Sequence, residues 1–113
     1  MSITTKTVDF VALLSYRTTE EGGRTTPVFK TGYRPQIKFE FSEMQTSGQQ
    51  KFLDKEIVYP GDNVEAEIQL LSPDFFENRL TEGMNFDFRE GARIIGTGEI
   101  KTIVNERLKK ASR

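Results

Sequence analysis

The fold of this chain is decided by residues 20–36, EEGGRTTPVFKTGYRPQ, which place two turns around a short apolar piece. Gly22 and Gly23 permit a positive φ, which a tight turn needs and most residues resist. Pro27 and Pro35 lack a backbone N–H, so they belong at strand ends or edges. This chemistry is typical of β-hairpins and predicts that the rest of the chain continues as strands.

Period-two alternation of hydrophobic and polar residues predicts strands on both sides of this stretch. Residues 8–16 start with alternation and become continuously apolar, as in a strand that is covered on both faces. Residues 37–41 alternate strictly, which points Ile37, Phe39 and Phe41 toward a core. Further strands are expected at residues 52–58, 64–70, 86–88 and 94–104.

Turn-forming residues separate these segments. Residues 42–50 are polar and contain Gly48, so we expect them to form a loop and to be the most mobile segment. Pro60-Gly61 suits the centre of a type II turn, and residues 90–93 suit a tight hairpin connection. Gly96 and Gly98 share one strand parity, which indicates close backbone approach or a sharp bend. About six strands without a convincing amphipathic helix predict a small antiparallel sandwich or barrel.

Composition excludes several classes of protein. The 113 residues contain neither Cys nor His, which excludes disulfides, thiolate zinc sites, cysteine nucleophiles, imidazole metal sites and Ser-His-Asp triads. We therefore expect no enzyme, no cofactor and no metal. The lack of Cys fits a reducing compartment, and residues 1–6 lack the apolar core of a signal peptide. Since no apolar run approaches the roughly 18 residues of a membrane span, we expect a cytoplasmic protein without a membrane partner.

Five short motifs occur in a characteristic order along the chain: Glu20 to Arg24, Gly32 to Gln36, Pro60 to Asn63, Phe88 to Gly91, and Gly96 to Gly98. In this order they resemble the C-terminal β-barrel, domain 3, of the elongation factor Tu family, over roughly residues 7–104. The resemblance implies an all-β fold, a single six-stranded antiparallel closed barrel. In the family this barrel packs on the GTPase domain, contacts the T stem of aminoacyl-tRNA and meets elongation factor Ts.

This resemblance divides the chain into a barrel at residues 1–104 and a tail at residues 105–113. The net charge is −1, but residues 101–113 hold five basic residues and one acid. We expect the tail to be basic and flexible, as chain ends commonly are. No P-loop pattern appears in the sequence, and the chain has no room for a GTPase domain, so we expect no nucleotide binding.

The family's contact positions carry over to four residues. Arg24 matches an arginine that contacts the T stem, and Gln36 and the pair Glu90-Gly91 also match contacting positions. These four residues are the candidate RNA or partner contacts. For Arg24, as for Arg34, Arg89 and Arg93, the alternative is pairing within the protein with residues such as Glu20, Glu21, Asp62 or Glu90.

Departures from the family pattern lie beside these positions. Thr25 stands where the family usually has histidine, Ser72 where some members place lysine, and Glu40 where arginine is common; Thr31 is an added residue. The loss of positive charge removes phosphate contacts. Asp87 replaces a small apolar residue that faces the GTPase domain in the family, which suits a face that meets water or another partner.

Three other features have simpler interpretations than a chemical site. Asp62 and Asn63 favour a turn over a calcium site, which needs six or more oxygens. Glu65 and Glu67 alternate on a strand and suit its solvated side. Phe75 and Phe76 could anchor a partner or fold over a barrel end.

The sequence thus predicts a non-enzymatic binding module related to domain 3 of elongation factor Tu, lacking the GTPase domain. It would engage RNA of a tRNA-like kind, or a translation factor or ribosome-associated protein, through Arg24, Gln36, Glu90 and Gly91. The alternative is a protein-interaction or scaffold barrel without an RNA role. The acidic Glu40 and the acidic first hundred residues favour that alternative.

Overall fold

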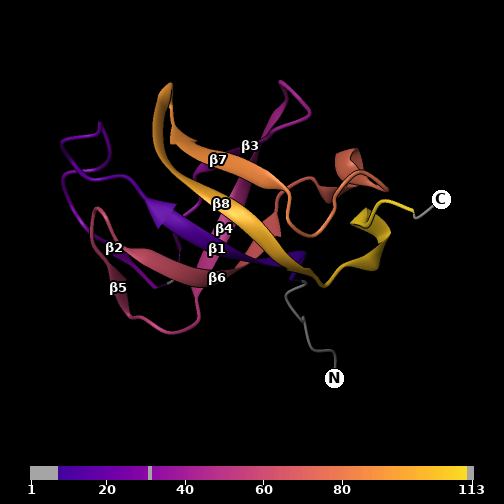
Figure 1. The fold of residues 1–113 in the computed structure, drawn as a ribbon, viewed down its shortest axis with the longest axis horizontal. Coiled ribbons are helices and arrows are strands. Elements are labelled where there is room, and N and C mark those ends of the chain that lie inside the picture. The colour runs from indigo at the N-terminus through magenta and orange to yellow at the C-terminus, as the bar shows by residue number, and fades with distance from the viewer. Residues whose placement is uncertain (1–7, 31, 112–113) are drawn as a thin grey trace.

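Six strands close into an antiparallel barrel in the order β1-β6-β4-β3-β7-β8 (Figure 1). The computed structural model describes residues 8–30 and 32–111. The barrel strands are β1 (Phe10–Tyr16), β3 (Gln36–Phe39), β4 (Gln45–Phe52), β6 (Asn63–Leu70), β7 (Asn85–Glu90) and β8 (Arg93–Ile103). The predicted all-β, six-stranded closed barrel is confirmed.

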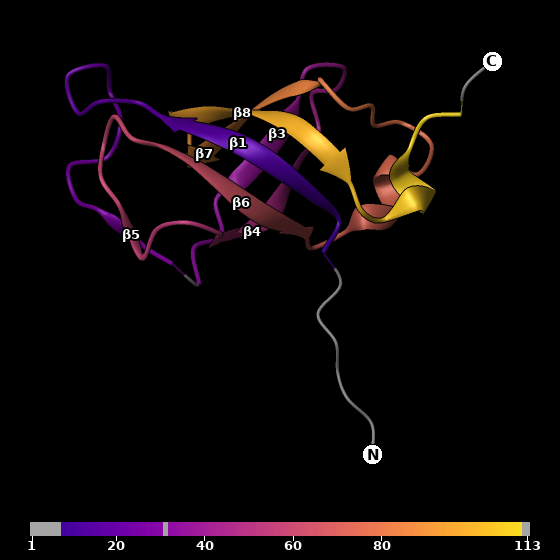
Figure 2. The ribbon, with the colours of Figure 1, turned by 60° about the horizontal axis from the view of Figure 1, so that its bottom comes forward.

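A second, two-stranded sheet lies at one end of the barrel. It pairs β2 (Val28–Phe29) with β5 (Ile57–Val58), while the 3-10 turns η1 (Pro73–Phe76) and η2 (Glu106–Leu108) lie at the other end (Figures 1 and 2). The single strand predicted at residues 52–58 is wrong, because Phe52 closes β4 and the chain leaves the barrel before Ile57. Pro27 and Pro35 each lie just before a strand, as predicted.

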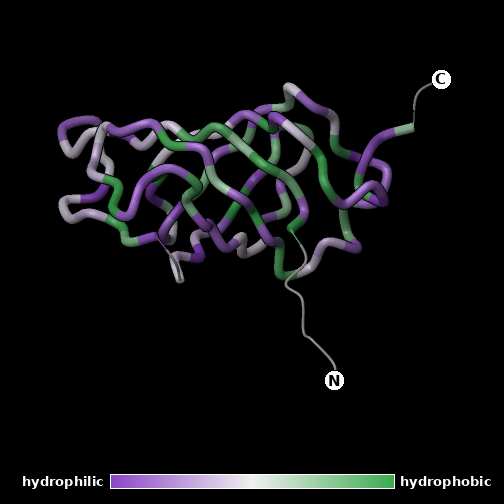
Figure 3. The backbone as a smooth tube through the Cα atoms, turned by 90° about the horizontal axis from the view of Figure 1, so that it is seen from below, coloured by the Kyte–Doolittle hydropathy of each residue, from purple (hydrophilic) through white to green (hydrophobic). Residues whose placement is uncertain are grey.

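Alternate side chains of each barrel strand fill the interior, and the alternation of hydropathy along the chain is visible in Figure 3. In β1 the buried residues are Phe10, Ala12, Leu14 and Tyr16, whereas Val11 and Leu13 are half-buried. The expectation that this strand is covered on both faces is therefore wrong, because only the inner face of a barrel strand meets the core.

The predicted loop at residues 42–50 is wrong, because β4 begins at Gln45. Its inward-facing residues are Thr46, Gly48 and Gln50, followed by Phe52. Because the first three are small or polar, the sequence lacks the alternation of apolar and polar residues that would reveal a strand. A Cβ on Gly48 would collide with Cδ1 of Ile37, so the glycine makes room for a core side chain. Phe41, predicted to face the core, lies beyond the end of β3, partly exposed, and stacks on Phe39.

The two glycines of β8 lie beneath aromatic rings, which confirms the predicted close approach. Gly96 is opposite Phe88 and Gly98 is opposite Phe86 in the β7–β8 pairing. A Cβ on Gly96 would lie 2.5 Å from Phe88 Cζ. The predicted tight connection at residues 90–93 is also present, since β7 ends at Glu90 and β8 starts at Arg93.

Residues 105–110 dock onto the barrel, which differs from the flexible tail expected there. Leu108 in η2 is buried, and Leu80 N–H donates to its carbonyl at 2.8 Å. The buried carboxylate of Asp9 accepts from Asn105 Nδ2 at 2.9 Å and from Leu70 N–H at 2.7 Å. The buried Leu108 side chain and the Asp9 carboxylate therefore hold the end of the chain to the barrel. Ser112 and Arg113 lie outside the described residues, as does Thr31.

Among the residues that the structure describes, there is no helix with the length and apolar character needed to traverse a bilayer.

Candidate functional site

Arg24 and Glu90 form an ion pair that joins the loop between β1 and β2 to the end of β7. Arg24 also donates from Nε to the Thr26 carbonyl at 3.2 Å and from Nη2 to Thr26 Oγ1 at 2.9 Å. The side chains of Arg24 and Glu90 are 24% and 38% exposed. The intramolecular alternative for Arg24 is therefore the arrangement found, and the pair still reaches solvent.

Tyr33 completes this cluster. Its hydroxyl donates to Glu90 Oε2 at 2.5 Å, and its ring centroid lies 5.3 Å from the Arg24 guanidinium carbon. Burial, and next the hydrogen bond to Glu90, raise the pKa of Tyr33. Partial burial lowers the pKa of Arg24, but the hydrogen bond and charge of Glu90 outweigh it, so the net pKa shift is upward. Arg24 remains a cation and Tyr33 a neutral donor.

The cluster continues into the barrel interior. The Tyr16 and Tyr33 ring centroids are 6.4 Å apart, and the Tyr16 hydroxyl donates to Gln50 Oε1 at 2.5 Å. Burial raises the pKa of Tyr16, which keeps the phenol protonated. Gln50 is fully buried, and its Nε2 has no hydrogen-bond partner among the described residues. Hydrogen bonds and one contact between aromatic rings therefore connect the partly exposed ion pair to the core.

Gln36 and Gly91 lie next to this cluster. Gln36 starts β3 directly opposite Arg89 of β7, and its Nε2 donates to Ser47 Oγ at 2.9 Å. Gly91 follows Glu90 in the exposed β7–β8 turn. The structure thus brings Arg24, Gln36, Glu90 and Gly91 to one end of the barrel, although they are up to 67 positions apart in the sequence. We name these four residues the Arg24–Glu90 surface.

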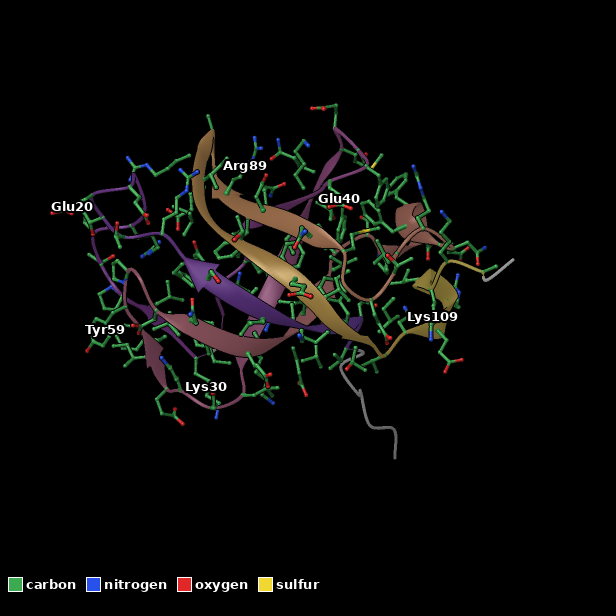
Figure 4. The ribbon with its side chains drawn as sticks, in the orientation of Figure 1. Glu20, Lys30, Glu40, Tyr59, Arg89 and Lys109 are labelled. Carbon is green, nitrogen blue, oxygen red and sulfur yellow. The ribbon has the colours of Figure 1, made fainter. Side chains whose placement is uncertain are left out.

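Two other arginines near this end, Arg89 and Arg34, have partners within the protein, and Arg93 at the start of β8 is exposed. Arg89 donates to both carboxylate oxygens of Asp87, at 2.7 and 3.1 Å. Arg34 donates to Gln49 Oε1 at 3.0 and 3.3 Å. Figure 4 shows Arg89 on β7. Asp87 is therefore a paired carboxylate. It lies on the outer face of the barrel with Arg89, because both alternate with the buried Phe86 and Phe88 along β7.

The residues that depart from the pattern of the resembling family lie at various distances from the Arg24–Glu90 surface. Thr25 is exposed beside Arg24, and Glu40 is exposed just beyond the far end of β3 from Gln36 (Figure 4). That separation is about 13 Å for four residues of extended strand. Ser72 precedes η1 at the opposite end of the barrel. Glu40, the departure that reverses a charge, therefore lies about one strand length from Gln36.

Asp62 holds a turn. Its Oδ2 accepts from Tyr59 N–H at 2.9 Å, and its own N–H donates to the Tyr59 carbonyl at 3.0 Å. Gly61 between them has a φ of +92°, as the predicted turn requires. Glu65 and Glu67 lie on the outer face of β6. Across residues 8–30 and 32–111, no three acidic side chains gather closely enough to hold a metal ion.

A small hollow lies beside Ser47, the hydrogen-bond partner of Gln36. It has a volume of about 210 Å³ and is lined by Arg34, Ser47, Gln49, Gln69, Leu70 and Leu71.

Two glycines shape the loop between β1 and β2. Gly22 has a φ of +101°, while a Cβ on Gly23 would lie 2.5 Å from the Arg17 carbonyl oxygen. The positive φ predicted for both holds for Gly22 alone, and Gly23 is needed for the close approach.

Sequence reasoning did not single out Tyr16, Tyr33 or Gln50. Tyr33 lies within the motif of residues 32–36, and its place in that motif was the available signal. Gln50 had no such signal, because its burial depends on the strands around it.

Comparison with known families agrees with this geometry. A family model described as the elongation factor Tu C-terminal domain matches residues 3–104 of the 113-residue chain. The matched range covers every barrel strand, the small sheet and all four residues of the Arg24–Glu90 surface. The chain therefore belongs to the elongation factor Tu C-terminal domain family.

Proposed function

We propose that this protein is a non-enzymatic binding module that engages structured RNA of a tRNA-like kind through the Arg24–Glu90 surface, in the cytoplasm. The family is that of a translation elongation factor's last domain. The proposal rests on one observation: four positions from three separate segments of the chain lie together at one end of the barrel, around one partly exposed ion pair. No nucleotide, cofactor or metal is part of the proposal.

The chemistry of the ion pair suits an RNA backbone. An RNA duplex presents phosphates and 2′-hydroxyls, and the hydroxyl both donates and accepts hydrogen bonds. Arg24 offers cationic donors to a phosphate or a hydroxyl oxygen, and Glu90 offers an acceptor to a hydroxyl hydrogen. Tyr33 and Thr26 hold the two charged groups in place, which lowers the ordering entropy that binding must overcome.

The binding test is a fluorescence-anisotropy titration of the full chain with labelled tRNA at low and at moderate salt. We expect saturable binding that weakens as salt rises, because phosphate contacts release counterions. Arg24→Ala is expected to weaken binding at least tenfold and to lower the slope of log K against log salt by about 0.7–0.9. Arg79→Ala, an exposed arginine on the segment after η1, is the matched control.

Two results would remove the RNA proposal: no binding at about 50 µM protein at low salt, where contacts to phosphates should be strongest, or equal affinity for the unchanged chain and Arg24→Ala. Circular dichroism of each variant verifies that the barrel is intact.

A protein partner is the second candidate, and two observations favour it. Arg24 and Glu90 already neutralise each other, and Glu40 places an acid about 13 Å from Gln36, just beyond the other end of β3. A translation factor or ribosome-associated protein would then be the ligand, or the barrel would serve as a scaffold. Recovery of the same stable protein partner from native lysate before and after nuclease treatment, and its loss with Arg24→Ala, would support this candidate over RNA.

A further inference from the structure

A small polar hollow lies on the outer face of β4 and β6, next to the start of β3. Gln49 and Gln69 stand opposite each other across β4 and β6, and both alternate with buried residues of their strands. The bridge between Tyr33 and Gln50 continues the β3–β4 register, so Arg34 lies across from Gln49. The hollow has a volume of about 210 Å³ and is lined by Arg34, Ser47, Gln49, Gln69, Leu70 and Leu71.

Arg34 supplies the hollow with a positive charge. Within residues 8–30 and 32–111, its guanidinium forms no ion pair with a carboxylate. Its Nε and Nη2 donate instead to the neutral amide oxygen of Gln49, at 3.3 and 3.0 Å. One edge of the planar group is thus occupied, and the edge formed by Nη1 and Nη2 remains for a second acceptor. A carboxylate accepts two parallel hydrogen bonds from such an edge.

The other lining residues add hydrogen-bond donors and an apolar side. Because Oε1 of Gln49 accepts from Arg34, the Gln49 amide nitrogen is left to donate to a ligand. Ser47 Oγ accepts from Gln36 Nε2 at 2.9 Å, which leaves the hydroxyl hydrogen of Ser47 to donate. Leu71 is 71% exposed. The lining thus combines one cation, neutral donors and an exposed aliphatic side chain, and it contains no acid.

We propose that this hollow binds a small carboxylate that carries a short aliphatic group. The carboxylate pairs with the open edge of Arg34, and the aliphatic group covers Leu71. A phosphate dianion fits less well, because a single cation lines the hollow and part of its wall is apolar. A free branched-chain acid and the C-terminal residue of a protein chain both present this chemistry.

This inference goes beyond the proposed function, because the ligand is a small acid and the hollow is lined by none of the four residues of the Arg24–Glu90 surface. The result of the tRNA titration therefore does not decide it.

The size of the hollow limits the ligand and its affinity. A cavity of about 150 Å³ holds a benzene molecule, so a hollow of about 210 Å³ holds a ligand with slightly more atoms. Isovalerate, the anion of 3-methylbutanoic acid, has about seven non-hydrogen atoms, and a dissociation constant of about 1 mM is the expected order for a ligand of that size in an open site.

Titration of the ¹⁵N-labelled full chain with isovalerate at pH 7 and constant ionic strength, followed by ¹H–¹⁵N NMR, tests this proposal. The range extends to about 20 mM, well above the expected dissociation constant. We expect saturable shifts of the backbone amides of Ser47, Gln49, Gln69 and Leu71. Isovaleramide, the neutral amide of the same acid, is expected to bind at least tenfold more weakly, because it lacks the charge that pairs with Arg34. Inorganic phosphate is also expected to bind more weakly.

Variants test the two halves of the hollow separately. Arg34→Gln is expected to raise the dissociation constant of isovalerate at least tenfold. Arg93→Gln is the matched control and should leave it unchanged, since Arg93 is also exposed but starts β8, which pairs with none of β3, β4 and β6. Leu71→Ser should weaken the binding of isovalerate and leave the shifts caused by acetate unchanged, because acetate has no aliphatic group to cover this side chain. A dispersed spectrum verifies that each variant is folded.

A further probe separates the two sources of the ligand. N-acetyl-leucine presents the same aliphatic carboxylate with a peptide group attached, as the end of a protein chain does. Tighter binding of N-acetyl-leucine than of isovalerate assigns the hollow to a chain end, and the reverse assigns it to a free acid. The proposal is overturned if isovalerate causes no saturable shifts, if isovaleramide or phosphate binds as tightly, or if Arg34→Gln and Arg93→Gln change the affinity equally.

Discussion

Substitution of Gly98 by alanine tests how the barrel is packed. Gly98 lies in β8 opposite Phe86, whose ring covers the position where a side chain would stand. A Cβ there would lie within 2.8 Å of three atoms of the ring. The ring has no room to retreat, because its centroid is 5.7 Å from those of both Phe10 and Phe39 in edge contacts. The added methyl group must therefore displace packed aromatic side chains.

The expected magnitude follows from two opposing effects. Overpacking a core costs about 1–3 kcal/mol, and here the upper part of the range applies because a rigid ring is displaced. Replacing glycine by alanine also reduces the entropy of the unfolded chain, which stabilises by about 0.4–1 kcal/mol. We expect Gly98→Ala to lower the free energy of unfolding by about 2 kcal/mol, the net of these two effects.

Gly48→Ala is the matched control. Gly48 is also a buried glycine within a strand, but the neighbour that its Cβ would meet is the end of the Ile37 side chain. Since that end can rotate away, we expect a loss of less than about 1 kcal/mol. Urea unfolding followed by far-UV circular dichroism measures both variants, and a difference of 2 kcal/mol corresponds to a midpoint shift of roughly 1 M.

The double variant Gly98→Ala with Phe86→Leu completes the test. If the ring is the obstacle, the smaller side chain makes room, and the double variant should be at least about 0.5 kcal/mol more stable than the sum of the single effects predicts. Strict additivity, or a Gly98→Ala variant as stable as the unchanged chain, would refute this account of the packing.

Three further changes in stability follow from the structure. Leu108→Ala should lower the free energy of unfolding by about 2–4 kcal/mol, because this side chain is buried in the core; a change below about 0.5 kcal/mol in urea unfolding would mean that residues 105–110 do not dock in solution. Tyr16→Phe should cost about 1–3 kcal/mol because it leaves the buried Oε1 of Gln50 unpaired, and adding Gln50→Leu should recover most of that loss; a further loss in the double variant would argue against the buried hydrogen bond. A double-mutant cycle with Arg24→Ala and Glu90→Gln should give a coupling energy of about 0.5–1 kcal/mol that shrinks at high salt, as expected for a partly exposed ion pair, and a coupling of zero at low salt would show that the pair contributes nothing to stability.

The sequence by itself determined the elements whose information is local. Residues 64–70 alternate between apolar and polar side chains, and they form β6 because one face of a strand enters the core. Pro60-Gly61 and the connection at residues 90–93 formed the predicted turns, because turn geometry depends on the residues at the turn itself. The ordered motifs also indicated the family, and with it the closed barrel.

Only the tertiary structure decided the features that depend on neighbours distant in sequence. Thr46, Gly48 and Gln50 are buried because β3 and β6 pair on either side of them, and their composition alone resembles a loop. The pairing of Arg24 with Glu90 depends on barrel closure, which brings together residues 66 positions apart. Local patterns record which side of a strand is buried, whereas the partner that covers it is set by how the six strands close.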